Sequence, residues 1–211
     1  MTSRLHISTL IAIVVLLWMA GLWIYNLPFT KDYLLPYSLV VSGVILIITV
    51  FKNWIWAWPI LQGWFVDRPD IRGTWEAELK STYIDPVTNQ ITAPITCYVT
   101  VRQTLNTLSF RLMSDKSNSK ILAHTFIKSE DGTYQMAGVY INTPKFEQRS
   151  ILSQIHYGSV FLQINGAQPT SLEGHYWTDR NTCGSLTLTK KHNIVCYTYE
   201  EALLVFNPTG N

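Results

Sequence analysis

Hydrophobic residues are distributed along the chain in two different ways, and the first is found near the N-terminus. No residue in 7–25 or in 33–51 is charged, and apolar side chains would cover every face of a helix formed by either run. At 1.5 Å per residue, each run is just long enough to cross a hydrocarbon layer of about 30 Å. The pattern predicts two transmembrane helices within a first domain, residues 1–66. Gly21, Ser42 and Gly43 are small residues that let such helices approach each other closely.

The few charges around these runs indicate an orientation. Arg4 precedes the first run and Lys52 follows the second, while the short link "NLPFTKD" contains a balanced Lys31 and Asp32. Basic residues collect on the cytoplasmic side of a membrane, so we expect both termini, and everything after the hairpin, to be cytoplasmic. A signal peptide is the alternative reading of the first run, but no A-x-A-like cleavage site follows it. Tryptophans typical of a membrane interface follow the second run: Trp54, Trp56, Trp58 and Trp64.

After about residue 67 the hydrophobic period changes to two. In "GTWEAELKS", Trp75, Ala77 and Leu79 alternate with polar residues, and "ITCYVTVRQ" and "LSFRLM" alternate in the same way. Further strands are predicted at 119–128, 133–142, about 155–165, 170–180 and 183–191. Turn signals fall between the strands: Asn106, Asp115 to Asn118, Asp131 and Gly132, Thr143 and Pro144, Asn165 and Gly166, and Asn181.

Eight short strands with no long helix between them favour an all-β, eight-stranded antiparallel up-and-down barrel. We place it at residues 67–192, after the two-helix transmembrane hairpin. Charged outer positions such as Glu76 and Glu78 exclude a barrel that faces lipid. For the C-terminal tail, 193–211, we expect a short helix or strand that closes one end of the barrel.

Composition and motifs exclude several functions. The net charge of +2 gives no basic field suited to a nucleic-acid polymer. The three cysteines are widely spaced, as expected of buried free thiols, and no metal-ligand spacing is present. There is no H-E-x-x-H, G-x-S-x-G or P-loop motif. Cys183 and His175 are conceivable as a nucleophile pair, but His175 is predicted on the outer face. We therefore expect no enzyme and no catalytic residues.

The predicted barrel interior is chemically unusual. If Leu172 points inward, then Tyr176, Thr178 and Arg180 do so as well, and the row that contains Tyr140 and Asn142 is similarly aromatic and polar. A buried arginine without a carboxylate is costly unless an anion joins it. A small phosphate ester with flat rings would satisfy the whole set, because arginine binds phosphate and aromatic rings stack on bases. The predicted ligand-binding residues are Trp75, Gln103, Tyr140, Asn142, Tyr176, Thr178 and Arg180, with Ser117 and Ser119 as weaker candidates.

Each of these residues also has a structural interpretation. Trp75 can plug the bottom of the barrel, and Tyr140 and Tyr176 can be core residues with satisfied hydroxyls. Arg180 can form a salt bridge at the rim. Ser117 and Ser119 can be turn residues that face solvent.

Several segments together resemble a known family: "IRGTW", "ITCYVTVRQT", "YINTP", "HYGSVFLQI" and "LEGHYWTDRNTCGSLTL", after two N-terminal spans. They resemble the two-transmembrane, β-strand-rich effectors of CBASS anti-phage systems, which are encoded beside a bacterial CD-NTase. The resemblance implies a cytosolic barrel that binds a cyclic dinucleotide made by the CD-NTase, and it implies no cofactor. Ligand contacts would come from Tyr140 and Asn142 of Y-x-N-x-P, and from Tyr176, Thr178 and Arg180 of G-x-Y-x-T-x-R.

The resemblance also implies a mechanism. Ligand binding would drive homo-oligomerisation through the transmembrane helices and disrupt the bacterial inner membrane, which causes abortive infection. Two other classes stay open: a membrane-anchored barrel that carries or senses a lipid or another apolar ligand, and a scaffold with a filled barrel.

Overall fold

The computed structural model describes residues 4–26, 37–84, 89–148 and 154–207 of the 211-residue chain. It separates into two compact units, Met1–Leu61 and Gln62–Asn211. The predicted link between the N-terminal helices and the first residues of the second predicted span, 33–36, lie outside the described residues, as does the end of the tail.

The first unit contains two helices, α1 (Arg4–Ile24) and α2 (Tyr37–Asn53), followed by the 3-10 turns η1 (Ile55–Ala57) and η2 (Pro59–Leu61). Within this unit, Leu17 of α1 packs over Gly43 of α2, where an added Cβ would lie 3.2 Å from Cδ1 of Leu17. Trp54 and Trp58 are exposed, whereas Trp56 is fully buried. Among the residues described, neither α1 nor α2 nor any other helix combines the length and the apolar character needed to cross a membrane.

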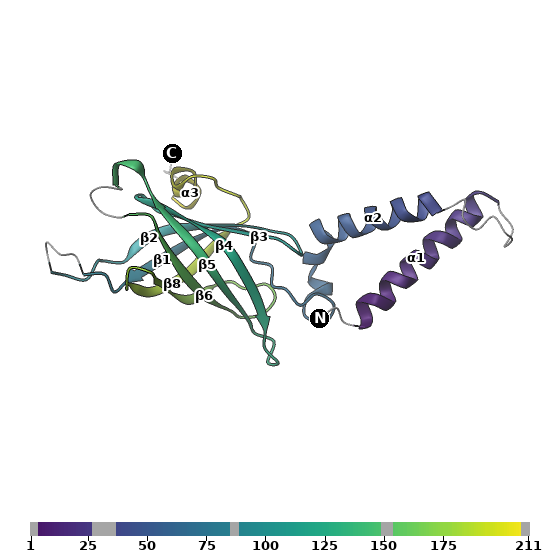
Figure 1. Ribbon diagram of the computed structural model, residues 1–211, viewed down its shortest axis with the longest axis horizontal. Helices are drawn as coiled ribbons and strands as arrows, with labels where there is room; N and C mark the ends of the chain where they lie inside the picture. Colours follow the sequence, from purple (N-terminus) through teal and green to yellow (C-terminus); the bar gives the residue numbers. More distant parts are fainter. Residues whose placement is uncertain (1–3, 27–36, 85–88, 149–153, 208–211) are drawn as a thin grey trace. The chain divides into compact units, whose positions relative to one another are not determined.

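The second unit is a closed barrel in which each strand is antiparallel to the next and β8 pairs with β1 (Figure 1). The predicted eight-stranded antiparallel barrel is thereby confirmed. Ser117 and Asn118 extend β4 and pair with Pro144 and Thr143 of β5, although these four positions were predicted as turns. The strands are β1 (Gly73–Ser81), β2 (Ile95–Gln103), β3 (Leu108–Met113), β4 (Ser117–Lys128), β5 (Tyr134–Pro144), β6 (His156–Ile164), β7 (Leu172–Thr178) and β8 (Cys183–His192).

An irregularity in β4 preserves the inward face of this long strand. The β4–β5 register shifts between Ile121 and Ala123. At this point β4 has one residue more than its partner strand. Because side chains alternate along a strand, the inward positions change from odd-numbered to even-numbered residues. Ser119 and Ile121 face the interior before the shift, and Phe126 packs against the core after it.

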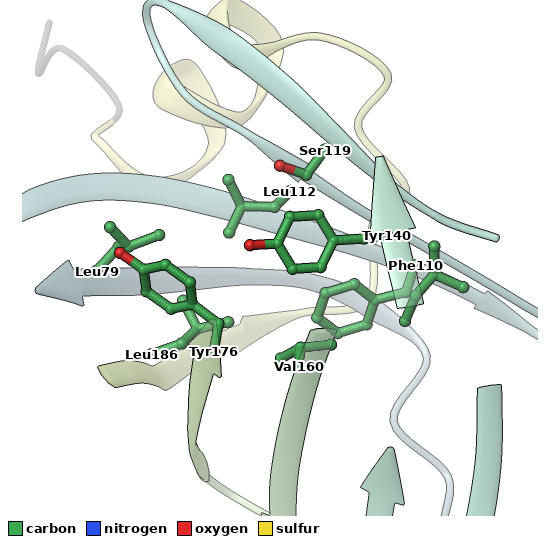
Figure 2. A pocket seen from close by; sticks show the side chains of 9 residues that line it. Leu79, Phe110, Leu112, Ser119, Tyr140, Val160, Tyr176 and Leu186 are labelled. Atoms are coloured by element: carbon green, nitrogen blue, oxygen red, sulfur yellow. The ribbon is translucent and has the colours of Figure 1, made fainter. Parts of the chain in front are cut away.

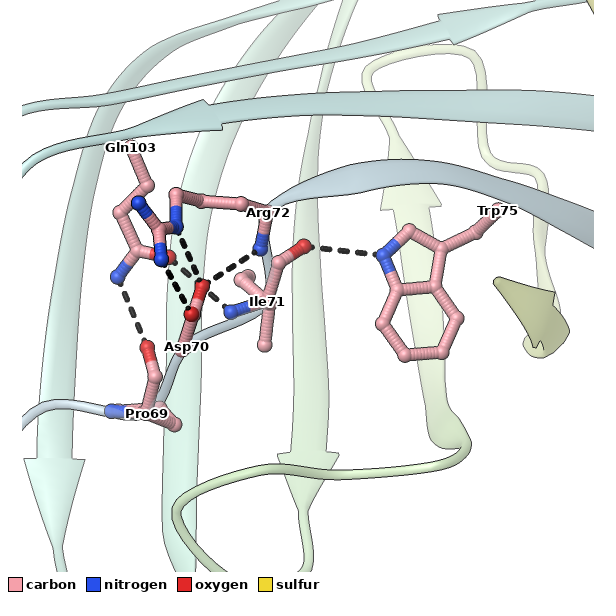
Figure 3. A network of polar contacts seen from close by, with 6 residues as sticks. All are labelled: Pro69, Asp70, Ile71, Arg72, Trp75 and Gln103. Carbon is pink, nitrogen blue, oxygen red and sulfur yellow. Dashed lines mark hydrogen bonds and ion pairs between the residues drawn. The ribbon is translucent and has the colours of Figure 1, made fainter. Parts of the chain in front are cut away.

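At the end of the barrel where the chain enters β1, the segment that precedes this strand is hydrogen-bonded to inward side chains of β1 and β2 (Figure 3). Ile71 is fully buried there, and its carbonyl accepts a hydrogen bond of 3.0 Å from Nε1 of Trp75. Gln103 accepts from the Ile71 amide at 3.2 Å and donates to the Pro69 carbonyl at 2.9 Å. The Asp70 amide donates to a carbonyl of the β6–β7 loop. These contacts make the segment 69–71 a plug held by backbone and side-chain hydrogen bonds.

The tail forms a helix, α3 (Tyr199–Phe206), which is capped at its N-terminus by Thr198, whose side chain accepts from the Glu201 amide. The expected closure of a barrel end was wrong, because α3 lies on the outer wall. Tyr98 of β2 points outward and is fully buried beneath this helix, with its ring centroid 5.4 Å from that of Tyr199 and 5.3 Å from that of Phe206. An outward tyrosine on β2 needs an apolar cover, and α3 supplies it.

Candidate ligand-binding cavity

The end of the barrel opposite the plug contains a cavity of about 250 Å³. A smaller apolar recess of about 40 Å³ lies deeper, lined by side chains such as Leu79, Phe110 and Leu186 (Figure 2). The larger cavity is lined by two basic side chains, Arg180 and His156, and by no carboxylate of the described residues. The cavity is rich in hydroxyl groups, contributed by Ser81, Tyr83, Thr92, Ser114, Ser117, Ser119, Tyr140, Tyr176, Thr178 and Thr182.

Two tyrosines form the boundary between the cavity and the recess. Tyr140 of β5 lies opposite Gly158 of β6, and Tyr176 of β7 lies opposite Gly184 of β8. Burial raises the pKa of Tyr140 well above its ordinary value, so its hydroxyl is a neutral donor at physiological pH. Burial also raises the pKa of Tyr176, against the effect of a hydrogen bond with Ser81. Within the described part of the chain, no residue forms a hydrogen bond with the Tyr140 hydroxyl.

Asn142 supplies an amide to the same cavity. The residue is 7% exposed, and its Oδ1 accepts a hydrogen bond of 2.9 Å from Oγ of Ser119, the residue opposite it on β4. This bond fixes the amide with its Nδ2 group available as a donor, and none of the described residues accepts from it. The Nδ2 group can therefore donate to a ligand or to water in the cavity.

Thr178 and Arg180 lie where β7 ends at the cavity mouth. Oγ1 of Thr178 is 2.8 Å from Oγ1 of Thr182 and accepts from the Arg180 amide at 3.2 Å. Asp179 fixes this turn to β6, because its carboxylate accepts from the Tyr157 amide. Arg180 is exposed, so the argument from a buried arginine was wrong: the strand ends at Thr178 and the next residues turn into solvent. Its guanidinium nevertheless lines the mouth.

Trp75 and Gln103 are not in this cavity. Both face the barrel interior, as predicted, but their polar groups bind the plug at the other end. Alternation along a strand identifies the inward face, but it does not say at which end of the barrel an inward residue lies. The set predicted from the interior rows is thus divided between two ends. Tyr140, Asn142, Tyr176, Thr178, Arg180, Ser117 and Ser119 line the cavity together.

Sequence reasoning missed several lining residues that the same alternation could have found. Ser81 follows Leu79 on the inward row of β1, and His156 lies opposite Asn142, two positions before Gly158. Thr182 belongs to the turn and has no such signal. Its place depends on the hydrogen bond with Thr178.

Residues 66–190 match the family model for the Cap15 cyclic dinucleotide receptor domain, which covers more than half of the chain. The chain belongs to this Cap15 family. CD-NTase-associated protein 15 of Staphylococcus schleiferi is 28% identical over 159 residues, which cover 74% of this chain and 79% of that protein. The resemblance to CBASS effectors is therefore confirmed, and the ligand of the receptor domain is a cyclic dinucleotide. The match contains every residue that lines the cavity, whereas α1, α2 and α3 lie outside it.

Proposed function

We propose that this chain is a membrane effector of CBASS defence in which the cavity at the open end of the barrel binds the cyclic dinucleotide. The ligand comes from a partner CD-NTase. The proposal is carried by one observation: Tyr140, Asn142, Tyr176 and Arg180 meet in one cavity that no described carboxylate lines. Arg180 suits a phosphodiester, the amide and hydroxyls suit base edges, and the tyrosine rings suit base faces.

The second part of the proposal concerns the N-terminal unit. The two uncharged runs of the sequence, residues 7–25 and 33–51, cross the bacterial inner membrane with both termini in the cytoplasm, and ligand binding drives homo-oligomerisation through them. The assembled helices disrupt the bilayer and cause abortive infection. Two features support this part: the uncharged runs of the sequence and the exposed apolar side chains of α1 and α2, among them Leu16, Trp23 and Leu46. A ligand can promote assembly if it binds the assembled form more tightly than the single chain.

The ligand-binding part is tested on the full chain in detergent micelles with a panel of cyclic dinucleotides. At about 100 times its Kd, a ligand adds about 2.7 kcal/mol to the free energy of unfolding, which raises the melting temperature. We expect one member of the panel to produce this shift, and Arg180→Ala and Tyr140→Leu to reduce it strongly. Arg102→Ala is the matched control, because Arg102 is an exposed residue of β2 away from the cavity. Equal shifts for Arg180→Ala and wild type would remove Arg180 from the site.

The membrane part needs a separate test, in vesicles of bacterial lipid loaded with a self-quenched dye. Ligand should release the dye when the wild-type chain is present. Gly43→Ile places a side chain against Leu17, so it should disturb the helix pair and reduce release while ligand affinity stays the same. Undiminished release by this variant would exclude the α1–α2 contact from the mechanism.

One observation favours a different ligand class. The recess below the tyrosines is apolar, as a barrel that carries or senses a lipid would require. If a fatty acid, but no cyclic dinucleotide, stabilises the chain through Arg180, this alternative replaces the proposal.

A further inference from the structure

The ring of Tyr140 occupies space that a side chain at position 158 would need. A Cβ built on Gly158 would lie 2.5 Å from both Cζ and Oη of Tyr140 and 2.6 Å from the Trp177 carbonyl oxygen. Two carbon atoms at van der Waals contact are about 3.5–4.0 Å apart, so this arrangement requires a glycine. The hydroxyl end of the tyrosine therefore lies against the β6 backbone.

The backbone of Gly158 does not itself require glycine. The glycines with positive φ are Gly63, Gly73, Gly132 and Gly166, and Gly158 is not among them. A glycine within a strand loses side-chain packing and often marks a place where another group approaches closely. At Gly158 the approaching groups are the Tyr140 ring and the Trp177 carbonyl oxygen.

Other glycines of the barrel have a different reason. A Cβ on Gly174 or Gly184 would lie 1.9 Å from a backbone carbonyl oxygen of the neighbouring strand, so the barrel wall itself excludes a side chain there. A Cβ on Gly138 would meet Cδ1 of Ile121 at 2.7 Å. At Gly158 the two nearest atoms, both at 2.5 Å, belong to the free end of a cavity side chain, and the Trp177 carbonyl oxygen of the neighbouring strand lies at 2.6 Å.

We propose that Gly158 is a positioning residue for the ligand: it lets the Tyr140 ring lie against the wall, which keeps the cavity open and places the tyrosine hydroxyl for the cyclic dinucleotide. The inference rests on the proposed ligand site. Tyr140 borders both the cavity and the recess, so a ring displaced from Gly158 would obstruct both (Figure 2). A methyl group at position 158 occupies the space that the end of the Tyr140 ring now fills. The ring must then move toward the cavity, which is the open side.

The test is a set of variants of the full chain, with affinity for the active cyclic dinucleotide measured by calorimetry. Gly158→Ala should lower affinity at least tenfold. In a Tyr140→Leu background, which has no ring to displace, adding Gly158→Ala should change affinity less than twofold. Gly138→Ala is the matched control for an inward methyl group, and we expect less than a threefold change in affinity.

A spectroscopic readout separates positioning from loss of folding. With tyrosine labelled by ¹³C at Cζ and the Tyr140 signal assigned by Tyr140→Phe, Gly158→Ala should move this signal in the absence of ligand and leave the signals of Tyr98 and Tyr134 in place. Affinity equal to wild type, an unmoved Tyr140 signal, or an equal loss in both backgrounds would overturn the inference. A Gly158→Ala chain that does not fold would also overturn it, because the wall would then be the reason for the glycine.

The same data separate this inference from the proposed function. If Tyr140→Leu and Arg180→Ala bind the ligand as wild type does, the proposed site is wrong. If both lose affinity while Gly158→Ala retains it, the site stands and the role of Gly158 is refuted.

Discussion

Replacing Gln103 tests whether the closed end of the barrel is held as the structure describes. The side chain is 6% exposed, and it both accepts from the Ile71 amide and donates to the Pro69 carbonyl. Gln103→Met keeps a similar volume but leaves these two backbone groups without a partner. Each such buried group costs about 1–3 kcal/mol, so we expect the loss of both partners to lower the free energy of unfolding by about 2–6 kcal/mol. For a chain of this size, that corresponds to a melting temperature lower by roughly 4–24 °C.

The assay is thermal unfolding of the full chain, combined with hydrogen exchange at the Ile71 amide, which should lose protection. Gln163→Met, at an exposed position of β6, is the control and should change stability by no more than about 0.5 kcal/mol. Ligand affinity should be unchanged in both variants, because the plug and the cavity lie at opposite ends. Unaltered stability with lost ligand affinity would refute this reasoning and return Gln103 to the ligand site.

Three further predictions concern groups outside the cavity mouth. Tyr98→Ala should lower the free energy of unfolding by about 3–5 kcal/mol and detach α3, detectable by faster proteolysis of the tail; a tail as resistant as in wild type would contradict the packing of α3. Burial and Arg68 lower the pKa of His124, so the unfolded chain binds a proton first and stability should decline as pH falls below about 6.5. His124→Gln should flatten that decline in pH-dependent melting, and an identical profile would rule out His124 as its cause. Iodoacetamide should label exposed Cys183 in the native chain and spare Cys97, whose pKa burial raises to about 12; mass spectrometry of the peptides decides, and equal labelling would be inconsistent with a buried Cys97.

The barrel was predictable because its strands keep strict alternation. Trp75, Ala77 and Leu79 repeat every second residue, and a half-buried strand produces this pattern wherever it lies in a sheet. The ends of the strands were harder to predict. Thr143 and Pro144 have turn chemistry, yet Pro144 ends β5 opposite Ser117 because the long β4–β5 pair continues past the rest of the barrel.

The candidate site was predictable in kind but not in extent. Tyr140, Asn142 and Tyr176 follow from the parity of inward rows, and the structure brings them into one cavity. Alternation says which residues face inward but not where they lie along the barrel axis. The prediction therefore grouped these three residues with Gln103, which lies at the opposite end. Nor could parity predict that β7 would end at Thr178, which leaves Arg180 in solvent at the mouth.

The packing of the tail on the outer wall could not be predicted from the local hydrophobic pattern. Alternation places Tyr98 outward, where a polar or solvated residue is the usual expectation. Thr74 and Thr100 also face outward, and they hydrogen-bond to the carbonyls of Ile194 and Cys196, respectively. These contacts join residues about a hundred positions apart, beyond the range of any period in the sequence.

Closure of the barrel through β1 and β8 has a consequence for synthesis of the chain. The first strand, β1, leaves the ribosome long before β8, the strand that pairs with its free edge. The cavity lining also includes residues from both parts of the chain, Ser81 and Thr182. The receptor is therefore incomplete until β8 has been translated. A product truncated before Cys183 would retain α1 and α2 but present two unpaired edges, which favour aggregation and degradation. Premature termination should thus yield cells that tolerate the fragment and no longer respond to the nucleotide.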